Sequence, residues 1–304
     1  MKVTLEQWRM LEAVVAAGGF HQASERVHKS PSSIHHAVHK LEDQLGLTLL
    51  KTEGRRIQPT EAAQALLRRA GLLLEEAVNL EEMAELLAQG VEPEVRLAVD
   101  QAFPAHLLAL ALADFSFNWP KTRIELRETV LSGGVELLYA GEIDLLISGL
   151  PVQGFLGEPL LEADFVCVAH YQHPLHQYRR LLADDLQPYR QLVIRDSARA
   201  HRLDAGWLQA EQRWTVSHVE TSLRMLKQGL GFAWLPRHLI ADELKTGELK
   251  CLPLPSEGRR VVPLQLILAD PRAAGPATQA LAEQLLRVSR EYKKSPDIES
   301  GQKA

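Results

Sequence analysis

The feature that most constrains this fold is the break between two short helical segments at Ser30-Pro31. Serine is favoured at a helix N-cap, and proline fits the first helical position, where its missing N–H costs no hydrogen bond. We therefore expect a short helix over Gln22–Val27, a tight turn at His28-Lys29 and a second helix that begins after Ser30. Two short helices joined in this way form a helix-turn-helix motif.

The residues around this motif predict further parts of a small N-terminal unit. Thr4 can cap a first helix of regular apolar spacing, and Gly18-Gly19 can end it. The helix after Ser30 is expected to end near Leu45, with Gly46 as its terminator. Its predicted inward positions are Ile34, Val38, Leu41 and Leu45.

A β-hairpin is predicted after this helix. Strands over Leu47–Leu50 and Arg55–Gln58 flank Glu53-Gly54 and place Arg55 and Arg56 near the tip. The hairpin would complete a winged helix-turn-helix domain over residues 1–60.

A seven-residue repeat of apolar side chains marks a long predicted helix over residues 61–90. The steps alternate between four and three residues along Leu66, Ala70, Leu73, Ala77, Leu80, Ala84 and Leu87. A stripe this narrow on a Glu-rich helix is typical of a coiled coil, so we expect it to pair with a second copy of the chain. Packing of this helix on its own domain is the alternative.

Strand and helix patterns alternate from Val91 onward, which predicts an α/β fold with mainly parallel sheets over residues 91–293. The expected strands are Val95–Asp100, Arg123–Glu128, Asp144–Ser148, Phe165–Ala169, Gln191–Arg195, Thr215–Val219, Phe232–Leu235 and Leu264–Ala269. The expected helices are Pro104–Phe115, Gly134–Ala140, Ala205–Gln212, Thr221–Gln228 and Pro276–Arg290. The polar tail over residues 294–304 is expected to be disordered.

Composition excludes several classes of protein. Of the 304 residues, 46% are apolar and 24% are charged, which is typical of a globular chain and not of a disordered or collagen-like one. No apolar run reaches the roughly 18 residues that cross a bilayer, and the first ten residues carry charge where a signal peptide has its apolar core. We therefore expect a cytoplasmic protein of two or three folded units.

Charge is distributed unevenly along the chain. The net charge is −5, but residues 1–60 hold eight Lys/Arg and six Asp/Glu, so this segment is at +2 and the remainder at −7. A basic N-terminal unit on an acidic body fits a protein that contacts DNA only at its basic end.

Three motifs carry a resemblance to a known family. The first is Gly19-Phe20-His21-Gln22-Ala23-Ser24-Glu25-Arg26-Val27 followed by Ser30, and the second is Leu41-Glu42-Asp43-Gln44-Leu45-Gly46 followed by Leu49-Leu50 and Pro59-Thr60-Glu61-Ala62. The third is Gly229-Leu230-Gly231-Phe232-Ala233-Trp234-Leu235-Pro236. Over nearly its whole length the chain resembles the LysR-type transcriptional regulators, in which the third segment belongs to the effector domain. The chain departs from the usual family residues at Pro31, His35, Leu50 and Ala63, so no base preference is carried over from relatives.

The resemblance implies an α/β protein with an N-terminal winged helix-turn-helix, a long dimerisation helix and a two-lobed, periplasmic-binding-protein-like effector domain. Lobe one would cover residues 91–162 and 267–293, and lobe two residues 163–266. The implied function is sequence-specific transcriptional regulation in the bacterial cytoplasm, modulated by a small-molecule effector between the lobes and without catalysis. The implied partners are double-stranded DNA with an interrupted inverted repeat, further copies in a homodimer or homotetramer, and RNA polymerase. No cofactor and no metal are expected.

The second helix of a helix-turn-helix fits the DNA major groove, where its early residues reach base edges. Serine and histidine can hydrogen-bond to bases, whereas lysine and arginine hold phosphates. The predicted DNA-binding residues are Gln22, Lys29, Ser30, Ser32, Ser33, His35, His36, His39, Lys40, Arg55 and Arg56. For any one of them taken alone, a solvated helix face is the alternative. A metal shared by His35 and His39 would lack a clear third ligand nearby.

Open α/β sheets bind ligands beyond the carboxyl ends of their strands. Applied to the expected strands, this rule predicts the effector-binding residues Asp100, Gln101, Ala102, Phe103, Glu128, Thr129, Ser148, Gly149, Asp196, Ser197, Thr221 and Ser222. Many LysR-type relatives have Ser or Thr at the position of Asp100, so we hypothesise an effector with an amine, amide or hydroxyl at that point. The alternative is that Asp100 caps the helix that starts at Pro104.

Two other functions share part of this pattern. A periplasmic-type solute-binding protein has the same two-lobed fold, and an α/β enzyme could carry the helical N-terminus for dimerisation only. The helix-turn-helix counts against the first, and the sequence has no nucleophile elbow, phosphate loop or metal cluster to support the second. Cys167 lies in an apolar strand and is expected to be a core residue, and Cys251 follows a loop, so redox pairing of the two is the minor alternative.

Overall fold

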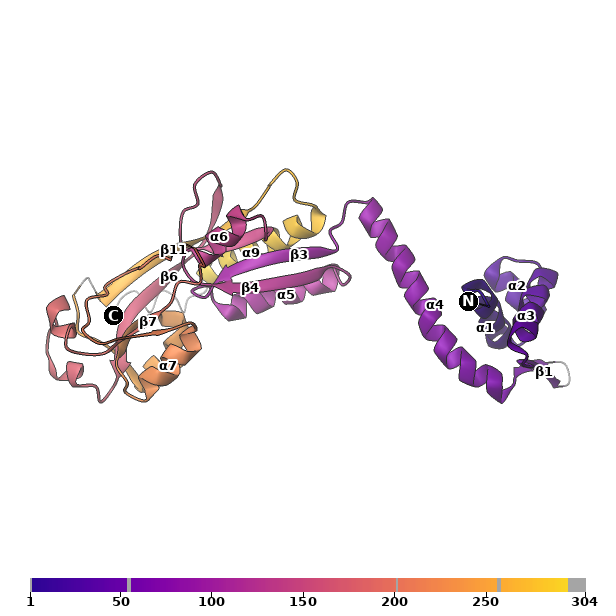
Figure 1. Cartoon of the computed structure of the whole chain (residues 1–304), viewed down its shortest axis with the longest axis horizontal. Helices are drawn as coiled ribbons and strands as arrows, with labels where there is room; N and C mark the ends of the chain where they lie inside the picture. The colour runs from indigo at the N-terminus through magenta and orange to yellow at the C-terminus, as the bar shows by residue number, and fades with distance from the viewer. Residues whose placement is uncertain (1, 54–55, 201, 256–257, 295–304) are drawn as a thin grey trace. The chain divides into compact units, whose positions relative to one another are not determined.

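The computed structural model describes residues 2–53, 56–200, 202–255 and 258–294. The chain divides into two compact units, Met1–Gln89 and Gly90–Ala304 (Figure 1). No helix of the described residues is long and apolar enough to cross a membrane.

The first unit is a helical bundle with a two-stranded wing. Its elements are α1 (Leu5–Ala17), α2 (Phe20–Val27), α3 (Pro31–Leu45), β1 (Leu50–Glu53), β2 (Arg56–Pro59) and α4 (Glu61–Ala88). The predicted caps are confirmed, since Thr4 and Ser30 each accept a hydrogen bond from the third residue of their helix and Gly46 is left-handed with φ 67°. Residues of α1, α2 and α3 and the residue before β1 form the core, which includes Met10, Leu11, Val14, Ala23, Ile34, Val38, Leu41 and Leu49.

The predicted wing strands were misplaced by one to three residues. The first strand is Leu50–Glu53, not Leu47–Leu50, and pairs antiparallel with Arg56–Pro59. The side chain of Glu42 at the end of α3 accepts hydrogen bonds from the N–H groups of Leu49 and Leu50, at 2.7 and 3.1 Å. Leu49 is fully buried, so the segment before the strand is tied to the helical core. The tip at residues 54–55 lies outside the described residues.

Helix α4 carries an apolar stripe that its own unit leaves uncovered. Leu73, Leu80 and Leu87 are 58%, 60% and 49% exposed, whereas Ala63 and Ala70 near the start of the helix are buried. The stripe is thus free over the second half of the helix, and its pairing with a second copy stays a prediction.

The second unit is one continuous sheet covered by helices. Its strands are β3 (Glu94–Asp100), β4 (Arg123–Thr129), β5 (Leu145–Ser148), β6 (Gly157–His170), β7 (Gln191–Ile194), β8 (Arg213–Val216), β9 (Phe232–Pro236), β10 (Leu249–Cys251) and β11 (Arg259–Leu268). Its helices are α5 (Ala105–Asn118), α6 (Gly133–Tyr139), α7 (Val219–Lys227), α8 (Ala241–Thr246) and α9 (Pro276–Lys294), with 3-10 turns at Pro174–Gln177, Ala183–Leu186 and Arg237–Ile240. The strand order is β4-β3-β5-β11-β6-β9-β7-β8, and β10 pairs with β6.

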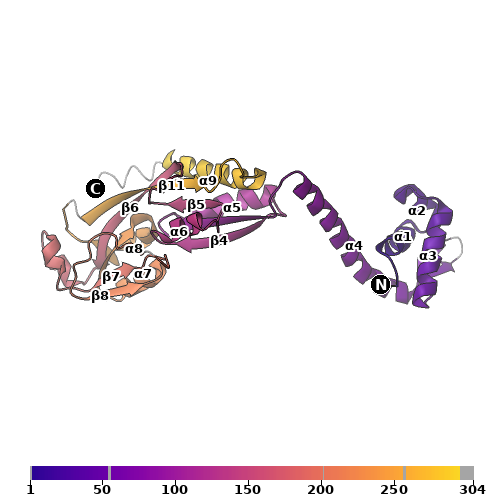
Figure 2. The same ribbon diagram turned by 45° about the horizontal axis from the view of Figure 1, so that its top comes forward.

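This sheet has two lobes joined by the long strands β6 and β11. In the first lobe β3 pairs in parallel with β4 and β5, and in the second β7 pairs in parallel with β8 and β9. Between the lobes β6 and β11 pair antiparallel, and β6 also pairs antiparallel with β9. Helices α5 and α9 lie side by side on the first lobe (Figure 2). The prediction of mainly parallel sheets therefore holds within each lobe and is wrong where the lobes join.

Several predicted boundaries were also wrong. The predicted strands 165–169 and 264–269 are only parts of β6 and β11, because Pro159, Pro263 and charged residues interrupt the apolar pattern of the other parts. The predicted strand 215–219 ends at Val216, and α7 begins at Val219. Helix α9 continues to Lys294, so residue 294 belongs to the helix and not to the expected tail; the rest of that tail, residues 295–304, lies outside the described residues.

The predicted helix over residues 205–212 does not form. Its segment is irregular, and the ring of Trp207 packs 6.0 Å from that of Phe232 and 5.9 Å from that of Trp234 (centroid distances). The carbonyl of Trp207 accepts a hydrogen bond from the Gln191 side chain at 2.7 Å. The carbonyl of Trp207 is thus satisfied by a side chain distant in sequence and not by a helical N–H.

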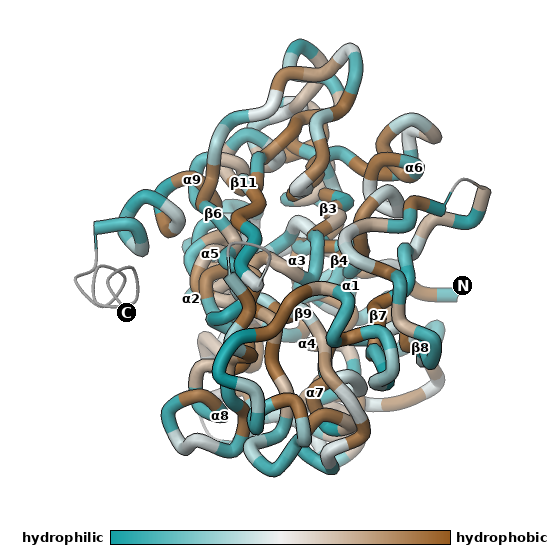
Figure 3. The backbone as a smooth tube through the Cα atoms, turned by 90° about the vertical axis from the view of Figure 1, so that its left-hand side faces the viewer, coloured by the Kyte–Doolittle hydropathy of each residue, from teal (hydrophilic) through white to brown (hydrophobic). Residues whose placement is uncertain are grey.

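Apolar stretches of the second unit follow strands such as β3 and β9, whereas α8 is mostly hydrophilic (Figure 3).

Candidate functional site

Helix α3 has one buried face and one exposed polar face. Ile34, Val38 and Leu41 are buried against the bundle, so at 100° per residue the residues Ser32 and His36 point the opposite way. The predicted DNA-binding side chains that the structure describes are all exposed: Gln22, Lys29, Ser30, Ser32, Ser33, His35, His36, His39 and Lys40. Arg55 lies outside the described residues. Arg56 is the first residue of β2, but its side chain is not among those that the structure describes.

Local hydrogen bonds order the start of α3. Ser30 Oγ accepts from the N–H of Ser33 at 3.2 Å and lies 3.1 and 2.8 Å from the hydroxyls of Ser32 and Ser33. Ser30 therefore acts as a helix cap, and the other two hydroxyls are held at the exposed end. Lys29 pairs with Glu6 of α1, so its charge is partly neutralised.

His35 and His39 form a pair on the flank of α3 that faces the wing. Their Nε2 atoms lie 3.1 Å apart, and Nδ1 of His39 is 3.0 Å from Oε2 of Glu42. A hydrogen bond between two ring nitrogens requires a lone pair on one of them, so one of the two rings accepts and the other donates. The ring of Phe20 packs on His35 at 4.9 Å. Within the described part of the chain, no cluster of three His, Cys, Asp or Glu could hold a metal ion.

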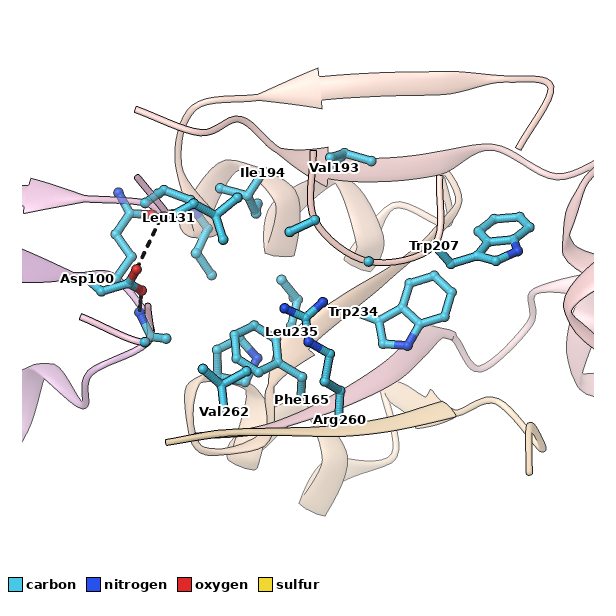
Figure 4. Close-up of a pocket in the computed structure, with 18 of the residues that line it drawn as sticks. Asp100, Leu131, Phe165, Val193, Ile194, Trp207, Trp234, Leu235, Arg260 and Val262 are labelled. Atoms are coloured by element: carbon cyan, nitrogen blue, oxygen red, sulfur yellow. Dashed lines mark hydrogen bonds between the residues drawn. The ribbon is translucent and has the colours of Figure 1, made fainter. Parts of the chain in front are cut away.

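The second unit contains a partly open cavity of about 230 Å³ (Figure 4). Both lobes and both joining strands contribute to its wall. The first lobe supplies Asp100, Gln101, Ala102, Val130, Leu131, Gly149 and Leu150, and the second supplies Gln191–Ile194, residues 205–208, Val219 and Trp234–Pro236. Strands β6 and β11 supply Phe165, Arg260, Val262 and Leu264.

Four of the predicted effector-binding residues line this cavity: Asp100, Gln101, Ala102 and Gly149. Three others, Phe103, Thr129 and Ser148, are buried beside it, and Ser148 Oγ accepts a hydrogen bond from the N–H of Leu150 at 3.0 Å. Glu128 and Thr221 are exposed away from the cavity, and Ser222 is buried within α7. Asp196 and Ser197 lie in contacts between the lobes, described below.

Asp100 closes a turn at the end of β3. Its Oδ1 accepts from the N–H of Ala102 at 2.8 Å, and its Oδ2 accepts from the N–H of Leu131 at 3.2 Å. It does not cap α5, whose N-cap Pro104 has no side-chain hydrogen bond. Burial raises the pKa of Asp100 to about 6. The two hydrogen bonds lower it in part, and the nearby charge of Asp196 adds to the rise.

Hydrogen bonds close the lobes over the cavity. The N–H of Val130 donates to Ser197 Oγ at 2.9 Å, and the N–H of Ser197 donates back to the carbonyl of Val130 at 3.2 Å. Ser132 pairs with Asp196, the N–H of Arg199 donates to Glu136 at 2.6 Å, and the N–H of Val219 donates to Gln101 Oε1 at 3.3 Å. Burial raises the pKa of Asp196, but hydrogen bonds from Ala198 and Ser132 outweigh it and the pKa lies below its ordinary value.

The strand-end rule missed the aromatic and cationic part of the wall. Phe165, Trp207, Trp234 and Arg260 lie within strands or on an irregular loop, so the rule could not select them. Trp234 stands in the Gly-x-Gly segment singled out from the sequence, and this was the one signal that could have found it. Cys167 is buried in β6 as expected, and burial raises the pKa of its thiol well above the ordinary value.

A helix-turn-helix unit followed by a two-lobed unit with a cavity between its lobes defines a ligand-responsive DNA-binding protein. The family "LysR substrate binding domain" matches residues 88–290, and "Bacterial regulatory helix-turn-helix protein, lysR family" matches residues 5–64. The chain therefore belongs to the LysR family of bacterial transcriptional regulators. It is a DNA-binding regulator with an effector-binding domain and not an enzyme, and the solute-binding or enzymatic alternative is not favoured.

Individual relatives agree with this assignment. The chain is 32% identical over 257 residues to the HTH-type transcriptional regulator YeeY of Escherichia coli K12, covering 82% of each chain. It is 29% identical over 256 residues to the probable HTH-type regulator YhaJ of the same strain, covering 82% of this chain and 85% of YhaJ. Its fold matches a cysteine mutant of OxyR from Corynebacterium glutamicum with a TM-score of 0.56 at 21% identity, over 95% of this chain and 93% of that one.

Proposed function

We propose that this LysR-family regulator binds an interrupted inverted repeat in promoter DNA as a homodimer or homotetramer in the bacterial cytoplasm. The observation that carries the proposal is the two-faced helix α3, whose Ile34, Val38 and Leu41 are buried while its early polar residues are exposed. A helix presented in this way enters a major groove with its N-terminal residues at the base edges. The exposed leucines of α4 support pairing of two copies, which would place two such helices on one repeat.

Within this proposal the exposed residues of the first unit read bases, approach the DNA from the flank of α3, or hold the DNA backbone. Ser32 and His36 read bases, since they lie opposite the buried face of α3 and can donate or accept, and Ser33 joins them from the exposed first turn. His35 and His39 reach DNA only from the flank, because they are hydrogen-bonded to each other. Lys29, Lys40 and the wing arginines Arg55 and Arg56 hold phosphates, and Gln22 and Ser30 contact the backbone beside them.

The cavity of the second unit is proposed to hold the small-molecule effector. Because the contacts of Val130 with Ser197 and of Ser132 with Asp196 bridge the lobes, an effector that contacts both lobes would favour the closed form. The change in lobe closure would then alter how paired copies sit on DNA and how they present a surface to RNA polymerase.

The test is retention of genomic fragments by the purified full-length protein at moderate salt, followed by sequencing. We expect a few intergenic fragments that share an inverted repeat. His36→Ala should change or abolish the retained set, and Lys40→Ala should weaken all fragments alike and lower the salt dependence of binding. Lys245→Ala is the matched control, because Lys245 is exposed on α8 in the other unit. Uniform retention by the wild type, or none, would contradict the proposal.

A further inference from the structure

One wall of the cavity contains a polar atom that the fold does not satisfy. Gln191, at the start of β7, is only 3% exposed, and its Nε2 donates to the carbonyl of Trp207 at 2.7 Å. A carbonyl can only accept, so this contact fixes the orientation of the amide. The other atom of the amide, Oε1, is buried and has no hydrogen-bond partner among the described residues. Leaving such a buried acceptor unpaired is unfavourable, so a ligand with a donor group would stabilise it.

The same wall contains an exposed cation, Arg260, that has no counter-charge among the described residues. Arg260 rises from β11 toward Trp234 (Figure 4), and it forms no ion pair or hydrogen bond with another described residue. Its neighbour Arg259, by contrast, pairs with Asp164 at 2.7 Å. Nη1 of Arg260 lies beside Gly206, where an added Cβ would approach it to 3.2 Å. The guanidinium is therefore placed over the loop that carries Trp207.

Aromatic and branched side chains complete this part of the cavity. Phe165 on β6 and Trp234 on β9 line it, and the indole rings of Trp207 and Trp234 are tilted by 42° with centroids 5.9 Å apart. Flat apolar surfaces of this kind bind rings by offset stacking and edge contacts. The cavity of about 230 Å³ lies below the roughly 300 Å³ at which drug-sized sites begin, so it suits a small molecule.

At the edge formed by the first lobe the charge is reversed. Asp100 lies opposite the tryptophans (Figure 4), and of the cavity's ionisable side chains it is the acidic one. An anionic group is attracted to Arg260 and repelled by Asp100, so the two charges together orient a ligand that has one anionic group and disfavour one that has two.

We propose that the effector is a small planar organic monoacid that carries a hydroxyl or amino donor. Its carboxylate pairs with Arg260, and its ring packs against Phe165 and Trp234. Its donor group satisfies Gln191 Oε1. This inference rests on the proposed effector role of the cavity and specifies the chemistry that the cavity selects.

The experiment titrates the full-length protein with defined probes, followed by tryptophan fluorescence and by the shift in thermal unfolding. Para-hydroxybenzoate, para-aminobenzoate and indole acetate combine a ring, one carboxylate and a donor. Benzoate lacks the donor, para-hydroxybenzamide lacks the charge, and terephthalate has a second carboxylate. We expect saturable binding of at least one complete probe below about 1 mM, and binding at least about tenfold weaker for the matched probe that lacks its charge.

Two variants assign the contacts. Arg260→Gln should weaken the acids about tenfold or more and leave the uncharged amide unchanged, whereas Arg259→Gln, outside the cavity, should change neither. Gln191→Leu also removes the hydrogen bond to Trp207, so its effect is measured as a ratio: the variant should lose the preference for para-hydroxybenzoate over benzoate. Thermal unfolding of each variant without probe shows whether it is folded.

The outcomes separate this inference from the proposed function. If the wild type retains promoter fragments but none of the three complete probes binds, or if Arg260→Gln binds acids as well as the wild type does, the inference is wrong and the regulator role stands. Equal affinity for terephthalate would also overturn the orienting role of Asp100. If no fragment is retained but the acids bind with the expected pattern, the DNA-binding proposal fails and the ligand assignment stands.

Discussion

The polar side chains of α3 and those of the cavity are held in opposite ways. On α3 they stand within one helix, a few residues apart, exposed and ordered by the local cap at Ser30. In the cavity, Asp100, Gln191 and Arg260 come from segments about 70 to 160 residues apart and meet only after the sheet has formed. A change in one exposed residue of α3 therefore alters one contact, whereas a change in the supports of the cavity alters its shape.

The largest expected effect tests whether the two units are stable independently. Leu41→Ala removes a fully buried side chain of α3 and should lower the free energy of unfolding of the first unit by about 2–5 kcal/mol. Hydrogen exchange measured peptide by peptide should show lost protection in the first unit and unchanged protection in the second.

The matched control is Leu47→Ala, because Leu47 is 44% exposed and its truncation should change stability by less than about 0.5 kcal/mol. Equal loss of protection in both units of Leu41→Ala would mean that they unfold together, and the contrast drawn above would fail.

The pH dependence of the second unit should reveal the buried carboxylate of Asp100. Its pKa is about 6 in the folded protein against an ordinary value of 3.8, so the unfolded chain loses this proton first as the pH rises. The contribution of Asp100 to the free energy of unfolding therefore falls between about pH 4 and pH 6, by up to about 3 kcal/mol. Denaturation of the wild type and of Asp100→Asn at both pH values should show this slope in the wild type only.

Asp196 is the natural contrast, because its pKa lies below the ordinary value. The contribution of Asp196 to stability is present above the unfolded-state pKa and is lost as the pH falls, so Asp196→Asn should remove a slope of the opposite sign.

If Asp100→Asn left the pH dependence of stability unchanged, the Asp100 carboxylate would not be desolvated as the fold requires.

A smaller effect, on ligand affinity, should follow from crowding the contact between the lobes at Gly133 and Ser197. A Cβ added at Gly133 would lie 1.9 Å from Ser197 Oγ and 3.0 Å from the Ser197 carbonyl carbon, so Gly133→Ala must displace that loop. We expect binding of para-hydroxybenzoate to weaken about tenfold while DNA retention stays unchanged. The double variant Gly133→Ala, Ser197→Gly makes room for the new methyl and should recover part of the affinity; no recovery would place the defect elsewhere.

The smallest expected effect is on the stability of the first unit, where a glycine is again replaced by alanine. Gly71 lies inside α4, and an added Cβ would come no closer than 3.8 Å to a neighbour, the Glu12 carboxylate. Gly71→Ala should therefore raise the free energy of unfolding by roughly 0.5–1 kcal/mol through helix propensity. Chemical denaturation of the full chain would measure it, and a loss of stability would mean that α4 needs this glycine for a close contact with another copy.

The same contrast explains what could be predicted from the sequence. The capped ends of α1 and α3, and the buried triad Ile34, Val38 and Leu41, follow from patterns a few residues long, and the predictions there are confirmed. The exposed stripe of α4 was visible in the same way. The predicted wing strands were displaced from the observed ones because the Glu42 side chain holds the N–H of Leu49 at the end of α3. This contact comes from a helix, so the apolar pattern of the strands gives no sign of it.

The second unit was predicted less completely because its determinants are long-range. Asp100 and Gly149 follow strands and were found, but Arg260 and Trp207 reach the cavity only because β11 crosses both lobes and residues 205–208 fail to become helical. The amphipathic pattern of residues 205–212 favours a helix locally, and the contacts of Trp207 with Phe232 and Trp234 override it.

The course of β6 and β11 has a consequence for engineering. The first described element of the second unit is β3 and the last is α9, both in the first lobe, so the second lobe is an insertion bounded by β6 and β11. The two boundaries face each other in the sheet, where Ala163 pairs with Val262. Exchanging the segment between two such facing positions for that of a relative would transplant one half of a sensor with only two junctions. The DNA-reading module and the first lobe would keep their own sequence, which makes this fold a cassette for building reporters of new metabolites.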